Sequence, residues 1–284
     1  MFFFELLSIP MSEGSFANLS IEMGGFYIML VAIFATIFIG GDITSGFIKN
    51  YAGSVSNRGQ IIAARVATIK GHKVTVFEKT NKLYGQINIA SVPPRKDEML
   101  RINQYYDEVI KHYNIEVVYN HEFTKQDAIG YDEIIVAVGA TNAHPPIKGI
   151  EHVIDSWDVL AGKELPLGHV LMAGGGLVGV ETTEYLAKKG YQITVIEMQE
   201  KIAKEESSTV LPTIMGSLKA HGVNVLTNHK ILEFTENSVT CQILDKDGNV
   251  TDTITVSGDV VVNALASKKA SIDLEGVSAN VHYV

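Results

Sequence analysis

The glycine-rich turn within residues 169–197 constrains the fold more than any other feature. This segment reads HVLMAGGGLVGVETTEYLAKKGYQITVIE. The apolar residues before the turn predict a strand, the residues after it predict a helix that Gly190 caps, and YQITVIE predicts a second strand. A strand, a glycine turn, a helix and a strand that ends in an acid are typical of a dinucleotide-binding βαβ unit. The order predicts an α/β protein with a parallel sheet.

The residues of this turn have separate predicted tasks. Gly174 permits a tight turn, Gly176 lets a pyrophosphate approach the backbone, and Gly179 lets the helix pack closely on the strand. The phosphates are expected at the helix N-terminus, where free N–H groups and the helix dipole favour negative charge. A fold element of the same shape that binds no ligand is the alternative. The predicted NADH-binding residues are Gly174, Gly175, Gly176, Leu177, Val178, Gly179, Glu181 and Glu197.

Glu197 predicts which dinucleotide binds. At the end of the second strand, its carboxylate is expected to accept hydrogen bonds from the adenosine ribose hydroxyls. A carboxylate repels a 2′-phosphate, and no arginine occurs in the following residues, MQEKIAKEE. NADH is therefore favoured over NADPH.

An earlier stretch of the chain repeats the end of this unit but not its beginning. IIAARVATIKGHKVTVFE predicts a helix capped by Gly71 and a strand that ends at Glu78. When the two copies are aligned on these features, Val55, Asn57 and Gln60 stand opposite the three glycines of the turn. Side chains thus occupy positions where a phosphate needs backbone contact. The first βαβ unit is predicted to be incomplete.

The remaining segments predict further elements. An amphipathic helix is expected from about Asp97 to Tyr113, followed by the strands IEVVY and DEIIVAVGA. The second of these strands is nearly all apolar, which suits a parallel sheet that is covered on both faces. ILEF, SVTCQIL and DTITV predict an antiparallel meander. DKDGNV is a hairpin turn within it rather than a calcium loop, because Val256 stands where such a loop needs Glu.

Composition excludes several classes of function. Hydrophobic residues make up 46% of the chain, which is enough for the cores of two domains. The formal net charge of −9 and the lack of a basic, aromatic cluster exclude a general nucleic-acid surface. The single cysteine, Cys241, excludes an internal disulfide and a CxxC redox pair. The histidines lack ligand spacing, so no structural metal is expected.

Residues 23–41 (MGGFYIMLVAIFATIFIGG) differ in composition from the rest. They carry no charge and are apolar on all sides of a helix. At about 1.5 Å per residue they nearly span a hydrocarbon core of about 30 Å, which predicts a transmembrane helix. A buried core helix is the alternative. Because Lys49, Arg58 and Arg65 follow the run, residues 62–284 are expected in the cytoplasm, anchored to a bacterial inner membrane.

A short stretch after this run resembles part of a transport protein. GDITSGFIKNYAGSVSNRGQII resembles the cytoplasmic segment that follows a transmembrane helix in bacterial ABC-type transporter permeases. The resemblance covers about residues 20–62. It implies that the chain joins two unrelated pieces near Ile61 to Arg65.

From about residue 62 to the end, the chain resembles a family of reductases. The resemblance is carried by GHKVTVFEKTNKLYGQINIASVPPRKDEM, YDEIIVAVGATNAHPPIKGIE, DSWDVLAGKELPLGHVLMAGGGLVGVETTEYLAKKG and GDVVVNALA. These segments are similar to the flavin and pyridine-nucleotide half of the NADH oxidase, enoate reductase and 2,4-dienoyl-CoA reductase family, relatives of old yellow enzyme. The resemblance implies a Rossmann-like FAD/NAD(P)-binding two-domain fold. Its implied parts are an N-terminal segment (1–61), a partial FAD-binding domain (62–166), an NAD(H)-binding domain (167–257) and a truncated return to the FAD-binding domain (258–284).

The resemblance also implies an FAD site. Glu78 would hold the ribose of the FAD adenosine, unless it is only a solvated acid at a strand end. Gly139 would belong to a turn near the cofactor, unless it serves the turn alone. The other residues expected near the flavin are Lys79, Gln86, Ala140 and Thr141.

Several departures from the family put FAD binding in doubt. The family's first strand and glycine loop are replaced by KNYAGSVSNRGQ, and Tyr84 stands where a second glycine is expected before Gly85. The chain stops at Val284, before the segment that closes over the flavin, and nothing corresponds to the family's FMN and iron–sulfur barrel. FAD binding is therefore expected to be weakened or lost.

Two functions follow from these observations. The first is an FAD-dependent oxidoreductase fragment that takes hydride from NADH and relays electrons through flavin to a small-molecule acceptor. The second is a fragment of a membrane transporter fused to an inactive nucleotide-binding passenger. The first accounts for more of the chain and is the prediction. Whether this chain is itself an active enzyme is left open.

Overall fold

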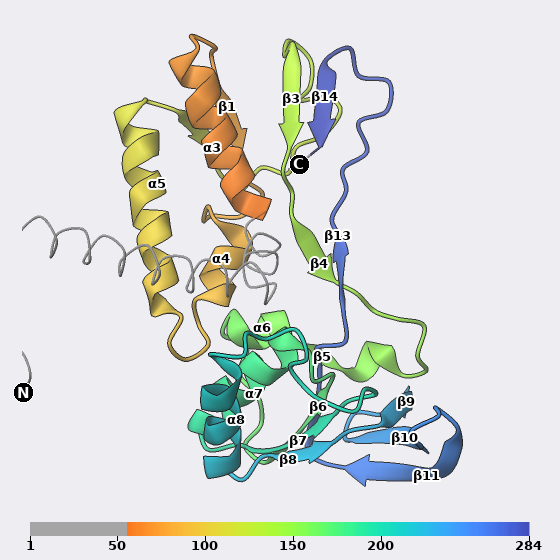
Figure 1. The fold of residues 1–284 in the computed structure, drawn as a ribbon. Helices are drawn as coiled ribbons and strands as arrows, with labels where there is room; N and C mark the ends of the chain where they lie inside the picture. Colours follow the sequence, from red (N-terminus) through yellow and green to blue (C-terminus); the bar gives the residue numbers. More distant parts are fainter. Residues whose placement is uncertain (1–55, 284) are drawn as a thin grey trace, which may run out of the picture. The chain divides into compact units, whose positions relative to one another are not determined.

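A computed structural model describes residues 56–283, which lie in the second of two units of the chain, Lys49–Val284 (Figure 1). We call residues 56–142 with 267–283 the first lobe, and residues 143–266 the second lobe. The predicted transmembrane helix at 23–41 lies outside the described residues, as does the permease-like segment up to residue 55. None of the helices within 56–283 is both long enough and apolar enough to span a bilayer.

The second lobe is built on a parallel sheet of five strands in the order β5–β12–β6–β7–β8. β6 lies at its centre and bonds to β7 on one side and β12 on the other. β5 and β12 fall outside the predicted range 167–257, so the sheet extends beyond that range on both sides. The strands are β5 (Ile154–Asp155), β6 (His169–Ala173), β7 (Gln192–Ile196), β8 (Asn224–Leu226) and β12 (Val260–Asn263).

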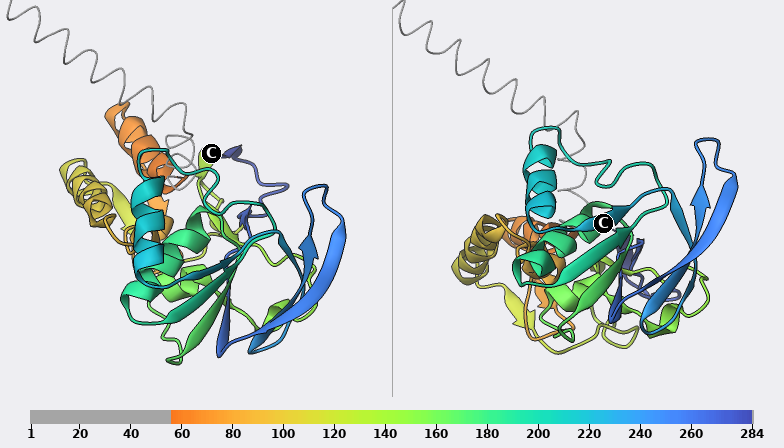
Figure 2. Two further views of the ribbon diagram at one scale, coloured as in Figure 1. Left: turned by 60° about the horizontal axis from the view of Figure 1, so that its bottom comes forward. Right: turned by 90° about the horizontal axis from the view of Figure 1, so that it is seen from below.

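The two faces of this sheet carry different layers. Val170 and Met172 of β6 pack with α7 and α8, whereas Leu171 and Ala173 face the antiparallel meander β9–β10–β11. This alternation follows from the period of two along a strand. Figures 1 and 2 show the helices on one face and the meander on the other. The layers are α7 (Leu177–Lys188), α8 (Leu211–Ala220), β9 (His229–Phe234), β10 (Ser238–Leu244) and β11 (Val250–Ser257), with η3 (Ile150–His152) and α6 (Ser156–Leu160) before them in the chain.

The first lobe repeats part of this plan. β1 pairs with β2 and β3 pairs with β14, both in parallel. α3 precedes β1 as α7 precedes β7, and Gly71, at φ 90°, follows its end as predicted. The elements are α3 (Ser56–Ile69), β1 (Thr75–Phe77), α4 (Gly85–Ala90), η2 (Asp97–Met99), α5 (Leu100–His112), β2 (Glu116–Val118), β3 (Glu133–Val136) and β14 (Asn280–Tyr283). Two antiparallel strands, β4 (Ala140–Asn142) and β13 (Ser267–Lys269), connect the lobes.

The sheet of the first lobe is divided. In the second lobe, β6 lies between β7 and β12, so its counterpart would lie between β1 and β3. Within residues 56–283, no strand bonds to the free edges of β1 and β3. α3 is continuous from Ser56, so the positions opposite Gly176 and Gly179 are helical, and the predicted join near Ile61 lies within one helix.

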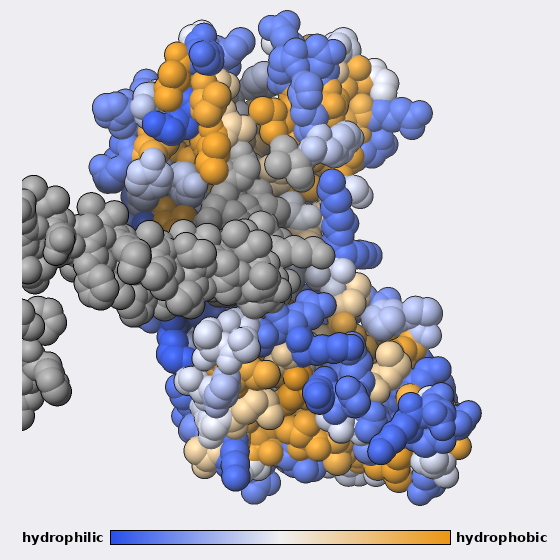
Figure 3. All heavy atoms as spheres, viewed as in Figure 1, coloured by the Kyte–Doolittle hydropathy of each residue, from blue (hydrophilic) through white to orange (hydrophobic). Residues whose placement is uncertain are grey.

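α3 also presents an apolar face to solvent. Ile61 and Ala64 pack into the core of the first lobe, but Ile62, Val66 and Ile69 are 46%, 47% and 51% exposed. The three exposed side chains recur at helical spacing, and Figure 3 shows apolar surface over this helix. The helix is therefore apolar on more than the face that its own lobe buries.

A candidate dinucleotide site and a partial flavin site

The glycine turn lies between β6 and α7, at the carboxyl edge of the parallel sheet. Gly174 has a φ of 103°, in the left-handed region, and a Cβ there would lie 2.6 Å from the carbonyl oxygen of Ala264. A Cβ on Gly179 would overlap the carbonyl oxygen of Gly174. The tight turn and the close approach of helix to strand therefore both need glycine, as the sequence predicts.

Gly176 differs from its neighbours because it borders open space. A Cβ there would meet no protein atom within 4 Å, and its φ of −67° suits any residue. Neither backbone conformation nor packing therefore explains this glycine. A pyrophosphate lying against the backbone would explain it, because a side chain would occupy its place. Gly176 precedes the first turn of α7, whose N–H groups and positive dipole end suit phosphate oxygens.

Glu197 is held at the end of β7 with its carboxylate toward the turn. One oxygen accepts a hydrogen bond from the Gly175 N–H at 2.7 Å, and the other accepts one from the Gln199 N–H at 2.8 Å. Each carboxylate oxygen can accept a further bond, so ribose hydroxyls still have acceptors available. The residues present therefore fit NADH, with phosphates at Gly176 and the adenosine ribose at Glu197.

The segment after Glu197 packs onto the turn, which the sequence did not reveal. The Ala203 N–H donates to the Gly175 carbonyl at 2.7 Å, and a Cβ on Gly175 would overlap Ile202. Ala203 has a φ of 48°, an uncommon conformation for a residue other than glycine. Gly175 is therefore required for packing against this segment. The only sequence signal is the small, apolar Ile-Ala pair among charged residues.

Glu181 forms an ion pair within the protein. It lies in α7 and pairs with Lys96 of the first lobe, and its side chain is 15% exposed. Burial raises the pKa of Glu181, although the positive charge of Lys96 opposes that rise. Its predicted cofactor-binding role stays a prediction, since the same carboxylate now has a structural partner.

A second ion pair between the lobes lies one helical turn further along α7. Nη1 and Nη2 of Arg95 donate hydrogen bonds to the two oxygens of Glu184, each at 2.6 Å, and Lys188 lies 3.5 Å from the same carboxylate. Glu184 is 2% exposed. Although burial pushes its pKa up, hydrogen bonds and the charge of Arg95 hold the pKa of Glu184 below its ordinary range. Two acids three residues apart and two adjacent bases are visible in the sequence, but their pairing is not.

The first lobe repeats the local geometry around the acid. Glu78 accepts a hydrogen bond from the Thr80 N–H at 2.8 Å, as Glu197 does from the residue two places after it. Asn120 donates its N–H to the Thr80 carbonyl, and Asn228 makes the matching bond in the second lobe. The two asparagines share left-handed conformations, with φ values of 55° and 58°. The strand end at Glu78, which is predicted to hold the FAD ribose, thus has the same local hydrogen-bond pattern as the strand end at Glu197.

The other residues predicted near the flavin are only partly brought together. The Gln86 side chain donates to the Ala140 carbonyl at 3.2 Å, so α4 and β4 meet there. Gly139 has a φ of 73°, which the turn before β4 requires, and Thr141 lies within β4. Lys79 is exposed and pairs with Glu122 at 3.1 Å. The residues present fit FAD in part. The strand end at Glu78 could hold the ribose, but the positions opposite Gly176 and Gly179 are helical.

Tyr84 does not block this region, although it replaces an expected glycine. It adopts the left-handed conformation, at φ 75°, that a glycine would supply. Its ring is buried beside Tyr106, and its hydroxyl donates to Asp107 at 2.6 Å. Burial, and then the hydrogen bond to Asp107, raise the pKa of Tyr84 far above its usual range. The side chain therefore serves the core of the first lobe.

Tyr84→Phe is expected to lower the free energy of unfolding by about 1–2 kcal/mol, because it removes a hydrogen bond to a charged group. Because Asp107 is exposed, water replaces the lost hydrogen bond, and the loss of stability is smaller than it would be for a buried carboxylate left without a partner. Urea denaturation measures the change. Tyr105→Phe is the matched control, since Tyr105 is 56% exposed on the neighbouring helix α5. Equal losses for the two variants would contradict a specific role for the Tyr84 hydroxyl.

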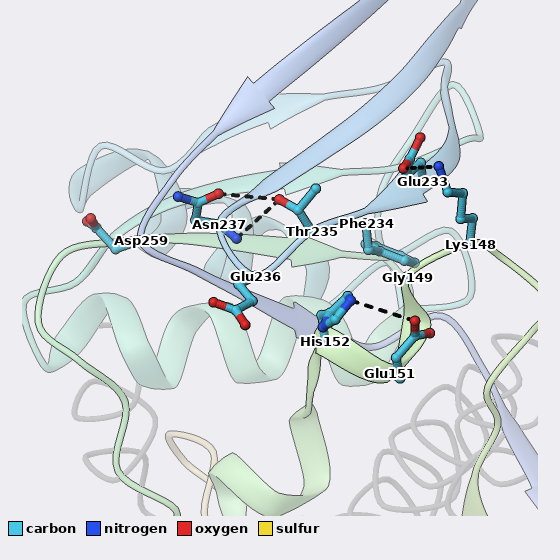
Figure 4. Close-up of a pocket in the computed structure, with 10 residues that line it drawn as sticks. All are labelled: Lys148, Gly149, Glu151, His152, Glu233, Phe234, Thr235, Glu236, Asn237 and Asp259. Atoms are coloured by element: carbon cyan, nitrogen blue, oxygen red, sulfur yellow. Dashed lines mark hydrogen bonds and ion pairs between the residues drawn. The ribbon is translucent and has the colours of Figure 1, made fainter.

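A separate cavity of about 630 Å³ lies elsewhere in the second lobe (Figure 4). Half of its lining residues are charged, with Lys148 paired to Glu233 at 2.6 Å, and His152 lies 3.6 Å from Glu151. It contains none of the predicted site residues. The remaining lining residues are Gly149, Phe234, Thr235, Glu236, Asn237 and Asp259.

The fold and the glycine turn together define a two-lobed α/β protein of the dinucleotide-binding class. Residues 59–276 match the sequence profile of the pyridine nucleotide-disulphide oxidoreductase family, and the chain belongs to that family. The prediction of a Rossmann-like fold whose cofactors are FAD and NAD(H) is thereby confirmed. Cys241, the one cysteine of the sequence, is buried in β10, so the chain carries no dithiol of its own.

Proteins similar to this chain include reductases that are longer than the chain. The chain is 42% identical over 219 residues to a bilirubin reductase of Mediterraneibacter gnavus, covering 76% of the chain and 33% of that protein. It is 32% identical over 185 residues to an NADH oxidase of Thermoanaerobacter brockii, covering 62% and 28%. A 2-naphthoyl-CoA reductase has the same fold, with a TM-score of 0.69 at 23% identity, over 82% of the chain and 35% of that structure. The chain thus spans about a third of the length of these relatives.

Proposed function

We propose that this chain forms the NADH-oxidising, flavin-reducing part of a reductase. NADH would supply a hydride, and FAD would accept it and pass the electrons on to a small-molecule acceptor. The second lobe binds and orients the dinucleotide through the glycine turn and Glu197. The first lobe contributes the ribose edge at Glu78 and the contact between Gln86 and Ala140. The similarity to reductases and an oxidase supports the redox role.

The observation that carries this proposal is the open space at Gly176. The other glycines of the turn are explained by packing or backbone conformation, whereas neither explains Gly176, and a bound phosphate would. The test is anaerobic addition of NADH to FAD-loaded protein. Loss of the yellow flavin absorbance is expected, and an unchanged spectrum at saturating NADH would contradict hydride transfer.

The charge of Glu197 is expected to set the preference for NADH. The unmutated chain should bind NADH more tightly than NADPH. Glu197→Ala should weaken NADH by about 1–2 kcal/mol, roughly five- to thirtyfold, and should improve NADPH binding by relieving repulsion. Titrations followed by nicotinamide fluorescence measure both affinities.

Glu197→Gln separates charge from structure in this test. Its amide oxygen can still accept the bond from the Gly175 N–H, so the turn should keep its shape, whereas the bond from the Gln199 N–H is lost because an amide NH2 group cannot accept it. Relief of NADPH repulsion should then appear without the full loss of NADH affinity. Equal affinities of the unmutated chain for the two dinucleotides would contradict the assignment of Glu197.

FAD retention is expected to be low. The positions opposite the glycine turn are helical in α3, and each charge-assisted hydrogen bond that the phosphates do not make forfeits roughly 1.5–3 kcal/mol. The flavin-to-protein ratio after purification, with and without added FAD, measures this. A near-stoichiometric flavin content without added FAD would contradict the prediction.

The transporter alternative depends on residues that lie mainly outside 56–283. None of the described contacts favours it, and membrane anchoring through 23–41 stays a prediction. Fractionation of cells that express the full chain tests it. Recovery of the intact chain without detergent would contradict a membrane anchor.

A further inference from the structure

The sheet order indicates where the nicotinamide end of a bound dinucleotide must lie. In open α/β sheets, ligands cross the carboxyl ends of the strands at the point where the strand order reverses. In the second lobe that point lies between β6 and β12. The adenosine end lies toward β7, because Glu197 follows that strand. The nicotinamide end therefore extends over the carboxyl ends of β12 and β5.

Three polar residues are linked at those two strand ends. Asn263 ends β12 and Asp155 ends β5, and their positions are paired in the sheet. One oxygen of Asp155 accepts hydrogen bonds from the Asn263 amide at 2.9 Å and from His144 Nε2 at 3.0 Å. Asn263 is 1% exposed, whereas the side chain of His144 is 53% exposed. The buried Asn263 and the Asp155 carboxylate thus hold an accessible imidazole in place.

This cluster is tied to the glycine turn. The Asn263 side chain accepts a hydrogen bond from the Leu265 N–H at 3.1 Å, which fixes the bend after β12. Within that bend, the Ala264 carbonyl lies against Gly174 so closely that no Cβ fits. The position of His144 relative to the phosphate site is therefore set by a short chain of packed groups.

The hydrogen bonds of His144 leave one ring nitrogen for a ligand. A carboxylate only accepts, so Nε2 carries the proton that it shares with Asp155, and Nδ1 of the neutral ring is an acceptor. The donors at the nicotinamide end of NADH are the ribose hydroxyls and the carboxamide N–H group. Either can supply the bond that Nδ1 accepts.

We propose that His144, oriented by Asp155 and Asn263, binds the nicotinamide riboside end of NADH through Nδ1. The inference rests on the proposed binding of NADH at the glycine turn. In this arrangement His144 touches the cofactor, while Asp155 and Asn263 are positioning residues. These three residues fix the nicotinamide end of the dinucleotide, and Glu197 fixes its adenosine end.

Three ligands of increasing length test the proposal on the full chain. ADP lacks the second ribose, ADP-ribose has that ribose without nicotinamide, and NADH has both. His144→Ala should weaken NADH roughly two- to tenfold, the equivalent of one hydrogen bond, and should leave ADP unchanged. Isothermal titration measures all three. Loss with both ADP-ribose and NADH identifies the ribose hydroxyls as donor, and loss with NADH alone identifies the carboxamide.

Control variants distinguish binding from a structural effect. His152→Ala removes a comparably exposed histidine that lines the separate cavity, and it should change none of the three affinities. His144→Asn, which keeps a hydrogen-bonding amide, should recover part of the lost NADH affinity. Asp155→Asn, which keeps the size of the side chain, should weaken NADH and spare ADP.

Two results would overturn the proposal. One is an equal loss of affinity for ADP, ADP-ribose and NADH in His144→Ala, which would make the histidine a structural tether. The other is no loss for any of them. Failure of the unmutated chain to bind any of the three would instead contradict the proposed function itself.

Discussion

Gly176→Val is expected to abolish NADH binding while leaving the fold unchanged. The new side chain meets no protein atom near its Cβ, and the backbone there is one that valine readily adopts. It does occupy the space that the pyrophosphate needs. We expect a loss of at least about 3 kcal/mol of binding free energy, roughly a hundredfold. Titration with NADH measures the affinity, and a thermal melt measures the fold.

Two other glycines sharpen this test. Gly216 in α8 also borders open space, so Gly216→Val should melt like Gly176→Val but bind NADH normally. Gly179→Val should instead lose the fold, because its Cβ would overlap the Gly174 carbonyl. Undiminished NADH binding by Gly176→Val would show that the turn is only a fold element.

Arg95→Met is expected to be the most destabilising single substitution in the contact between the lobes. It leaves Glu184 buried, with Lys188 at 3.5 Å as its remaining cationic partner. Removing one partner of a buried ion pair costs about 3–5 kcal/mol. Because Arg95 is itself 43% exposed, solvent screens the pair, and we expect about 2–3 kcal/mol. Urea denaturation at neutral pH measures the loss.

The asymmetry of burial provides the control. Glu184→Gln should cost less than Arg95→Met, because the exposed guanidinium regains water whereas a buried carboxylate does not. Arg95→Lys should be intermediate, since it keeps the charge but loses the paired geometry. A larger loss for Glu184→Gln than for Arg95→Met would contradict this account.

The cost of Arg95→Met should also depend on pH. The folded-state pKa of Glu184 lies below its ordinary value of 4.5, so the ion pair contributes its full stability above about that pH. As the pH falls through the lower, folded-state pKa, the carboxylate becomes protonated in the folded state as well. The difference in unfolding free energy between Arg95→Met and the unmutated chain should then shrink. A difference that grows on acidification would contradict the assignment.

The second lobe could be predicted largely from sequence because its signals are local. The turn, the capping glycine and the strand-end acid lie within one continuous stretch, and each acts on neighbouring backbone. The alternation along β6 likewise follows from the pleat of a strand. The predicted meander corresponds to β9, β10 and β11, with its hairpin at DKDGNV. Gly174, Gly179 and Glu197 accordingly lie where the pattern placed them.

The membership of β5 and β12 in the same sheet was not visible in this way. Both strands are short, and β12 follows the meander, so the chain order separates it from β6. The pairing of β12 with β6 depends on a crossover that no local pattern encodes. The strands that carry Asp155 and Asn263 lie outside the predicted limits of 167–257, and those domain limits stay a prediction.

The sequence by itself determined a dinucleotide-type turn, its acid, and a first copy with side chains in place of the glycines. Each of those features spans only a few residues, and at that range residue propensity and backbone geometry determine the local structure. Only the tertiary structure decided that Gly176, alone among the glycines of the turn, borders open space, that Arg95 and Lys96 pair with α7, and that His144 meets Asp155. These facts depend on segments far apart in the chain. Their contact is fixed by how the sheet and its covering layers pack.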